Sequence, residues 1–160
     1  MTNFFKKSDL SRNEAENIVS NTLNKCDDGE LYLEDSKSES IILDDNKIKN
    51  SSYSSDLGFG FRAISDEIVA YSHSNEISKN SLKQSSESLK STLKSTKGTY
   101  NHSIPKSNKR YYDNINPIEQ KSLNEKIEIL NKVNNYLRSK DSNVKQVTAN
   151  FSGEQKSIEI

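Results

Sequence analysis

The segment from residue 57 to residue 64 constrains the fold most, because two kinds of side chain alternate along it. One alternating set is apolar and comprises Leu57, Phe59, Phe61 and Ala63. The other set comprises Gly58, Gly60 and Arg62. Successive side chains of a β-strand point to opposite faces, so this period of two predicts a strand with one face against an apolar core. The glycines then lie on the other face, where another backbone can approach closely.

More β-favouring segments accompany this strand, and polar turns separate them. They comprise residues 30–34, 39–43, 47–53 and 67–72. Short turns between successive strands predict antiparallel hairpins, because parallel neighbours need a long crossover connection. We therefore expect an antiparallel or mixed sheet of about five short strands.

Two helices are expected to pack on this sheet. The first spans residues 11–25 and begins at a capping box, in which Ser11 and Glu14 each bond a free backbone N–H. Gly29 is suited to the left-handed position that follows the last turn of a helix. The second helix spans residues 78–95 and begins at a serine, which is a good N-cap. Its apolar positions are Leu82, Leu89 and Leu93.

The remainder of the chain predicts a linker and part of a second domain. Residues 96–116 are polar and aperiodic, which is typical of a linker. A third helix begins near Pro117 and contains a second S-x-x-E pattern from Ser122. The apolar positions of this helix are Leu123, Ile127, Leu130, Val133 and Leu137. After it, alternating residues on both sides of Ser152-Gly153 predict a hairpin, which is marginal without further strands.

These elements define an α+β fold class with an expected division into three parts. Residues 1–95 form an N-terminal α/β domain, residues 96–116 form the linker, and residues 117–160 form the helix and hairpin that start a second, truncated domain. The hydrophobic fraction is only 31% and the mean hydropathy is −0.90, which approaches the range of disordered chains. Because the apolar residues cluster in phased segments, we expect a folded chain with a thin core.

Charge and hydropathy argue against a nucleic-acid partner and a membrane. The 23 basic and 23 acidic residues interleave, and no face gathers the basic ones. The tightest basic cluster, residues 106–110 with Tyr111 and Tyr112 behind it, is compatible with stacking on single strands, but we favour a solvated linker. No apolar run approaches the ~20 residues that span a membrane, and the first residues lack a signal-peptide core. We therefore expect a cytoplasmic protein.

The sequence contains no pattern that indicates a catalytic or metal-binding site. A zinc peptidase usually places two histidines at helical spacing beside a glutamate, whereas this chain has only His73 and His102. The single cysteine, Cys26, lies on the apolar side of the first helix and is expected to be a buried thiol. Nothing in the spacing supports a Cys26–His73 nucleophile pair. No residue is therefore predicted to be catalytic or to bind a cofactor or a metal.

Two further patterns are interpreted as structural. Gly58-Phe-Gly60 lacks the third glycine that a dinucleotide-binding G-x-G-x-x-G motif places at the start of a helix. A group of carboxylates lies close together in sequence and suggests a hydrolytic pair or a Ca²⁺ site. These are Glu34, Asp35, Glu39, Asp44 and Asp45. They fall at predicted strand ends and turns without the EF-hand glycine and terminal glutamate, so we predict solvated acids.

Several segments carry a resemblance to a known family. They include Gly29-Glu-Leu-Tyr-Leu33, Asp56-Leu-Gly-Phe-Gly-Phe-Arg-Ala-Ile-Ser65, Ala70-Tyr-Ser72 and Val147-Thr-Ala149. In these segments the chain resembles the N-terminal region of the TldD/PmbA metallopeptidases, and the run from Arg62 to Ser65 favours the TldD branch. Phe59 and Phe61 depart conservatively from the usual valines of that family.

The resemblance implies a cytoplasmic zinc peptidase that acts on flexible peptides as a heterodimer with a TldE/PmbA-like subunit. In that family a His-Glu-x-x-x-His helix and a distant cysteine hold the zinc, and both lie downstream of the region matched here. Cys26 does not match that cysteine, and no ligand can be carried over. We therefore expect a non-catalytic, structural or assembly role and no hydrolysis by this chain alone. A stand-alone α/β interaction module is the alternative.

Overall fold

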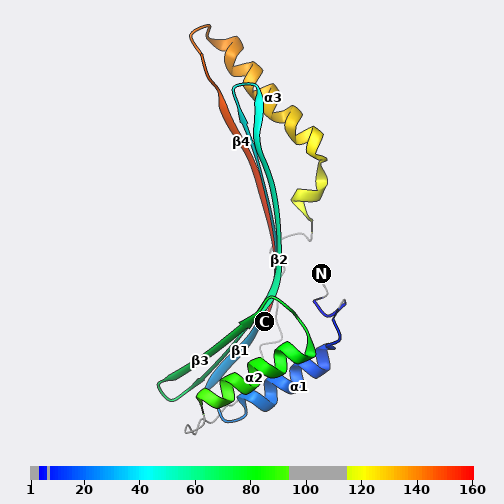
Figure 1. The fold of residues 1–160 in the computed structure, drawn as a ribbon, viewed down its shortest axis with the longest axis vertical. Helices are drawn as coiled ribbons and strands as arrows, with labels where there is room; N and C mark the ends of the chain where they lie inside the picture. The colour runs from blue at the N-terminus through cyan, green and yellow to red at the C-terminus, as the bar shows by residue number, and fades with distance from the viewer. Residues whose placement is uncertain (1–3, 7, 94–114) are drawn as a thin grey trace. The chain divides into compact units, whose positions relative to one another are not determined.

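The computed structural model describes residues 4–6, 8–93 and 115–160 and confirms the α+β class. The strands form one antiparallel sheet in the order β3-β2-β1-β4 (Figure 1). Their bounds are Asp28–Asp44 for β1, Lys47–Ser65 for β2, Ile68–Ser74 for β3 and Thr148–Glu159 for β4. The helices are α1 (Arg12–Leu23), α2 (Lys79–Thr92), the 3₁₀ turn η1 (Pro117–Gln120) and α3 (Leu123–Lys140).

The prediction of about five short strands was wrong in number and length. β1 contains both segments 30–34 and 39–43, and β2 contains both 47–53 and 57–64. The polar residues between these segments had suggested turns. A strand tolerates polar side chains because its backbone makes the ladder bonds whatever side chain it carries. Only the tight turn at Asp45 and Asn46, where φ is 48° and 65°, divides β1 from β2.

The described residues cluster into two compact units. The first unit takes residues within 1–35, 56–112 and 157–160, and the second takes residues within 36–55 and 113–156. The clustering therefore groups 36–55 with residues that come much later in the chain. The sequence-based division at 95 and 117 remains a prediction about domains.

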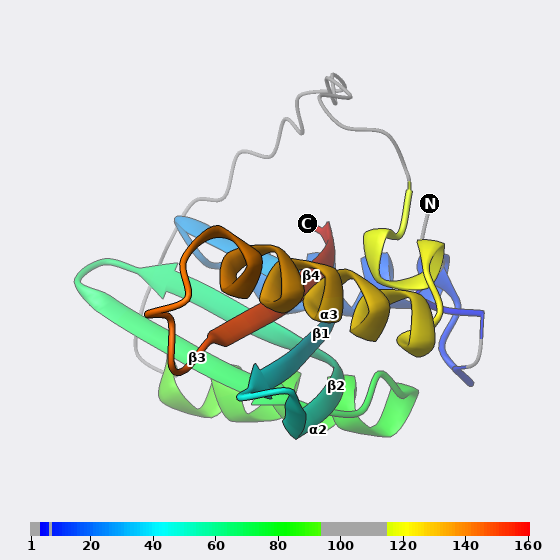
Figure 2. The same cartoon turned by 90° about the horizontal axis from the view of Figure 1, so that it is seen from above.

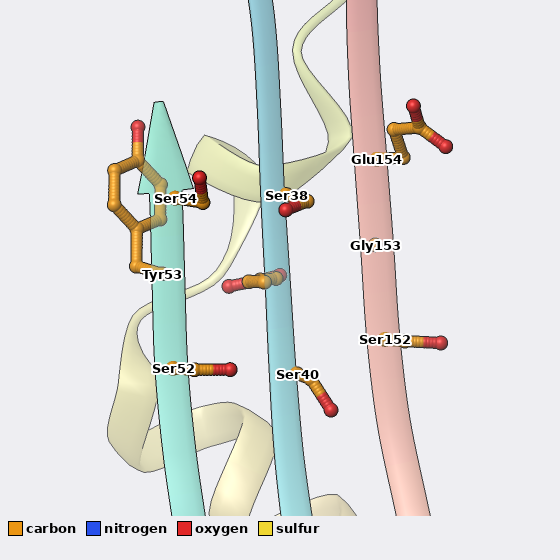
Figure 3. Close-up of a pocket in the computed structure, with 9 residues that line it drawn as sticks. Ser38, Ser40, Ser52, Tyr53, Ser54, Ser152, Gly153 and Glu154 are labelled. Atoms are coloured by element: carbon orange, nitrogen blue, oxygen red, sulfur yellow. The ribbon is translucent and has the colours of Figure 1, made fainter. Parts of the chain in front are cut away.

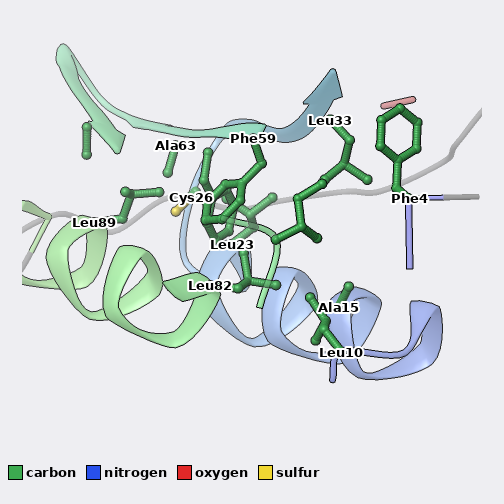
Figure 4. Close-up of a cluster of buried hydrophobic side chains, with 13 residues drawn as sticks. Phe4, Leu10, Ala15, Leu23, Cys26, Leu33, Phe59, Ala63, Leu82 and Leu89 are labelled. Carbon is green, nitrogen blue, oxygen red and sulfur yellow. The ribbon is translucent and has the colours of Figure 1, made fainter. Parts of the chain in front are cut away.

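The first unit contains a layer of two helices on one sheet face. α1 contacts α2, and α2 contacts β3. The core between helices and sheet is formed by buried apolar side chains, several of which Figure 4 shows between the layers. Phe59, Phe61 and Ala63 are buried as the alternation predicted, but Leu57 is 44% exposed. Beyond the turn at Asp66, β3 pairs with β2 in the register that sets Phe61 opposite Ser72.

The helix caps of the first unit match the sequence-based predictions, whereas the predicted helix-ending role of Gly29 was wrong. Ser11 and Glu14 form the capping box of α1, and Ser78 caps α2. Gly29 lies in β1 and has no positive φ. It is required instead by close packing, because a Cβ there would lie 2.8 Å from the carbonyl oxygen of Arg62 and would overlap Leu23.

The second unit packs α3 on strands of the sheet (Figure 2). Ile41, Leu43 and Leu130 form its buried apolar cluster, with Ile127, Ala149 and Phe151 packed against them, and Ile118 and Val147 are buried as well. The predicted helix start near Pro117 is a separate 3₁₀ turn, and α3 begins at the Ser122 capping box. The predicted apolar positions were partly wrong, because Leu123, Val133 and Leu137 are exposed. Lys126 and Asn134 are buried in their place.

Polar contacts attach α3 to the strands of the second unit. Lys126 Nζ donates to Glu39 Oε2 at 2.7 Å and to the carbonyl oxygen of Ile118 at 2.6 Å. The side chains of Lys126 and Glu39 are only 5% and 10% exposed. At the other end of the helix, Asn134 donates to Asn46 at 2.5 Å, and Arg138 pairs with Asp45.

The predicted C-terminal hairpin was wrong, because β4 is one strand over residues 148–159. Gly153 was expected in a turn, but it continues the strand beside Glu39. A Cβ at this position would lie 3.3 Å from Glu39 Oε1. The glycine therefore leaves room for the buried ion pair of the neighbouring strand.

Candidate functional site

Cys26 and His73, two of the possible metal ligands in the sequence, lie apart within the first unit. Cys26 is 3% exposed and belongs to the core, and its Sγ donates to the carbonyl oxygen of Thr22 at 3.7 Å. Burial raises the pKa of the Cys26 thiol, and the nearby Asp27 carboxylate adds a smaller effect in the same direction. Both causes disfavour the thiolate. His73 is exposed on β3 and stacks on Tyr71. His102 lies outside the described residues.

The sequence-adjacent carboxylates mainly contact side chains of neighbouring elements. Asp44 accepts hydrogen bonds from Gln146 and Thr148, and these bonds lower the pKa of the Asp44 carboxyl. Asp45 pairs with Arg138, and Glu39 pairs with Lys126. Across residues 4–6, 8–93 and 115–160, no group of three His, Cys, Asp or Glu residues is arranged to hold a metal ion.

A pocket of about 230 Å³ lies in the first unit, on the sheet face that the glycines share. It is lined by Tyr32, Glu34, Asp56, Leu57, Gly58, Phe59, Gly60, Tyr71, His73, Ser74 and Asn75. We call it the tyrosine–glycine pocket. It combines aromatic rings with carboxylates above a floor that has no side chains at its two glycines.

Each wall of the tyrosine–glycine pocket is held by a specific contact. The Tyr71 ring lies over Gly60, where an added Cβ would be 2.7 Å from Tyr71 Oη. The Tyr71 and His73 rings stack with centroids 5.9 Å apart and planes 27° apart. The Tyr32 hydroxyl donates to Glu34 Oε2 at 2.5 Å. This bond, which the neutral phenol makes, raises the pKa of Tyr32 to about 12.

The predicted close approach to the strand glycines is confirmed at Gly58, where the approaching group is backbone. An added Cβ at Gly58 would lie 2.5 Å from the carbonyl oxygen of Ser74. The sequence patterns alone do not predict the pocket. The signal that could have indicated it is one tyrosine in each neighbouring strand, Tyr32 in β1 and Tyr71 in β3.

Arg62 lies on the same face and is already paired. Its Nε is 3.1 Å from Glu30 Oε1, and its guanidinium is 3.5 Å from Asp28. The alternation of β1 places Asp28, Glu30 and Glu34 on one side of that strand. This face of the first unit therefore carries more carboxylates than cationic side chains.

A second, larger pocket of about 410 Å³ lies in the second unit and is rich in hydroxyl groups. Figure 3 shows its serines on three strands, namely Ser52 and Ser54 on β2, Ser38 and Ser40 on β1, and Ser152 on β4. A serine nucleophile needs a neighbouring base, and none of the lining residues is histidine or lysine. The lining also contains two glutamates, of which Glu39 pairs with Lys126 and Glu154 pairs with Lys156. This pocket offers polar binding groups.

Comparisons with known proteins agree with the resemblance noted in the sequence. A sequence model described as PmbA/TldA metallopeptidase domain 1 matches residues 29–96. A metalloprotease TldD homolog of Buchnera aphidicola (strain APS) is 35% identical over 136 residues, which are 84% of this chain and 28% of that protein. The Haemophilus influenzae TldD homolog is 33% identical over 132 residues, which are 79% of this chain and 27% of that protein.

A solved structure supports the fold. TldE of Thermococcus kodakarensis superposes with a TM-score of 0.62 at 19% identity, over 90% of this chain and 34% of that one. The fold and the matches define a PmbA/TldD metallopeptidase domain, and the chain belongs to that family. The curated relatives are TldD homologues, and the chain spans about a quarter to a third of their length. Among the described helices, none is long and apolar enough to cross a membrane.

Proposed function

We propose that this chain supplies the first, non-catalytic domain of a TldD-type metallopeptidase. Metal binding and peptide cleavage are then supplied by polypeptide outside the region present here. The match to a domain 1 model supports this assignment, as does the small share of each TldD homolog that the chain covers. The working protein acts on flexible peptides in the cytoplasm, together with a TldE/PmbA-like subunit.

The side chains of the described residues do not fit a zinc site, and this observation carries the non-catalytic assignment. A zinc site needs three or four donors at about 2.0 to 2.3 Å from one point. The Cys26 thiol is in the helix-facing core, whereas His73 lines the pocket on the other sheet face. Because the sheet lies between them, no rotamer change brings them to one metal. We derive no catalytic step through a metal for these residues.

A scaffold role is consistent with the packing. The first unit has an extensive apolar core, and the second is held by a buried ion pair. Both give rigid backbone on which further domains or a partner subunit can be positioned. In this proposal the domain shapes the assembly and its access to substrate.

Two measurements on the purified 160-residue chain test the proposal. After dialysis, atomic absorption should find far less than one zinc per chain. A fluorogenic unstructured peptide should remain uncleaved when excess zinc is added back. Peptide cleavage that a chelator abolishes, or one tightly held zinc per chain, would overturn the proposal.

The alternative function is a stand-alone interaction module, and the tyrosine–glycine pocket is the observation that favours it. The two functions predict different coding sequences near this one in the same genome. An adjacent or in-frame segment that contains His-Glu-x-x-x-His supports the peptidase domain. A genome without such a segment supports the module.

A further inference from the structure

We infer that the solvent-facing side of α3 binds the same side of α3 in a second copy of this chain, with the two helices antiparallel. This surface lies wholly in the second unit. The inference goes beyond the peptidase assignment and does not depend on it, because every group that it uses is present in this chain.

The surface is a row of side chains that recur at helical spacing along α3. Its members are three or four positions apart, so they lie within about 80° of the helix circumference. We call this row the α3 stripe, and it comprises Glu125, Ile129, Val133, Tyr136 and Lys140. The buried residues of the helix lie on the neighbouring side, toward the strands, and are Lys126, Leu130 and Asn134.

The apolar part of the α3 stripe is open to solvent. Val133 is 42% exposed and Tyr136 is 57% exposed, whereas Ile129 is half-buried. Leu137, at the edge of the stripe, is 42% exposed. Single apolar residues are ordinary on a protein surface. Four of them on one side of one helix form a continuous patch, which is typical of an interaction surface.

The two ends of the α3 stripe carry opposite charges. Glu125 lies in the first turn and Lys140 in the last. The backbone N–H and the hydroxyl of Ser122 donate to Glu125 Oε2 at 2.7 and 2.8 Å, so the carboxylate is fixed at one end. At the other end, Lys140 Nζ lies 4.7 Å from the centre of the Tyr136 ring. These signs suit the helix dipole, and they also give the stripe an acidic end and a basic end.

A second copy matches both parts of the stripe in one antiparallel register. In this register a twofold axis passes between residues 132 and 133. Glu125 then lies opposite Lys140 of the second copy, because the two positions are equally far from the axis. Ile129 lies opposite Tyr136 of the second copy for the same reason. The symmetry forms each pair twice, and opposite charges with facing apolar groups favour this partner over an unrelated helix.

The first test is sedimentation equilibrium of the intact 160-residue chain. We expect a monomer–dimer equilibrium with a Kd on the order of 50 µM, because the surface is smaller than a standard interface. Tyr136→Ser should raise this Kd about tenfold, since the tyrosine is the largest apolar group of the contact. The matched control is Tyr53→Ser on β2, because Tyr53 is 60% exposed in the same unit and lies outside the stripe. It should leave the Kd unchanged.

The second test concerns the register. Glu125→Gln keeps the capping box, in which glutamine also serves, but removes a charge that faces Lys140 twice per dimer. It should raise the Kd about fivefold. Glu128→Gln, which removes an exposed carboxylate from another side of α3, should leave the Kd unchanged. Circular dichroism verifies the fold of each variant.

Three results would overturn the inference. The first is a chain that remains monomeric at about 1 mM, which is far above the expected Kd. The second is a dimer that Tyr136→Ser and Tyr53→Ser weaken equally, or that neither weakens. The third is an equal effect of Glu125→Gln and Glu128→Gln, because the acidic end of the stripe would then have no particular partner. If Tyr136→Ser unfolds, Val133→Ser takes its place with the same expectation and the same control.

Discussion

Different kinds of contact stabilise the interior of each of the two compact units. The first buries a large apolar cluster between its helices and sheet, including Phe61 and Leu82 at no more than 1% exposure. The second has a smaller buried cluster of Ile41, Leu43 and Leu130, and it adds the buried Lys126–Glu39 pair. Because its apolar core is small, the second unit depends more on a few polar contacts for its specific fold. The stability of the two units should respond to different kinds of substitution.

The largest expected effect is that of removing an apolar side chain from the first unit. Phe61→Ala should lower the free energy of unfolding by about 3 to 5 kcal/mol, because it leaves a cavity in the core. Val69→Ala on β3, where the side chain is 59% exposed, is the control and should change stability by less than about 1 kcal/mol. Urea denaturation followed by circular dichroism measures both. Similar losses for the two variants would contradict the described core.

The second prediction concerns the ion pair of the second unit. Lys126→Met should cost about 3 kcal/mol, because Glu39 is left buried without its cation. The double variant Lys126→Met with Glu39→Leu should recover much of this loss, since no buried charge remains unpaired. The same denaturation experiment measures each. A double variant as unstable as the single one would mean that the bond from Lys126 to the carbonyl oxygen of Ile118, which both variants lose, matters more than the charge of Glu39.

The third prediction compares two glycines of the first unit. Gly29→Ala should cost about 2 kcal/mol, because the new methyl group meets the backbone oxygen of Arg62. Gly60→Ala meets the exposed end of the Tyr71 side chain, which can move, and should cost less than about 1 kcal/mol. Thermal unfolding would rank the two variants. The opposite order would refute the described packing around Gly29.

The smallest expected effect is a difference between the two helix capping boxes in how they make stability depend on pH. Glu14, bonded by Lys79 and Ser11, has its pKa lowered to about 2, and Glu125 has its pKa lowered by Ser122. A carboxyl whose pKa is lowered in the folded state stabilises the fold above its ordinary pKa. This stabilisation is lost as the pH falls through the lowered value. For Glu14 the loss should extend from about pH 4.5 down to about pH 2.

Unfolding measured across that pH range tests this expectation. Glu14→Gln should flatten the acid-induced loss of stability more than Glu125→Gln does, because the Lys79 hydrogen bond exists only at the first capping box. Equal flattening by the two variants would show that Lys79 contributes nothing measurable.

Local features of the fold were predictable from the sequence, whereas those set by distant residues were not. The caps at Ser11, Ser78 and Ser122 depend on neighbours within three residues, so the sequence contains all the information that they need. The burial of Lys126 depends on Glu39, which lies 87 positions away. No helical periodicity predicts a lysine on the buried side, so the apolar positions of α3 were partly misassigned.

The candidate pocket could not be predicted from the sequence for the same reason. The alternation in β2 correctly predicted the glycine face, but Tyr32 and Tyr71 reach that face only through strand pairing. The strand lengths were also missed, because polar side chains at 35–38 and 54–56 mark a turn and an exposed strand equally well. The non-catalytic interpretation remains a prediction that the zinc and peptide assays test.

The hydrogen bond from Tyr32 to Glu34 has a practical consequence for labelling chemistry. Nitrating reagents attack phenolate, so Tyr32, with its pKa raised to about 12, should resist them at mildly alkaline pH. Tyr71 is largely accessible in the same pocket. Mass spectrometry after brief nitration should therefore find the modification at Tyr71 and little of it at Tyr32, and nitration of Tyr32 would report loss of its hydrogen bond to Glu34.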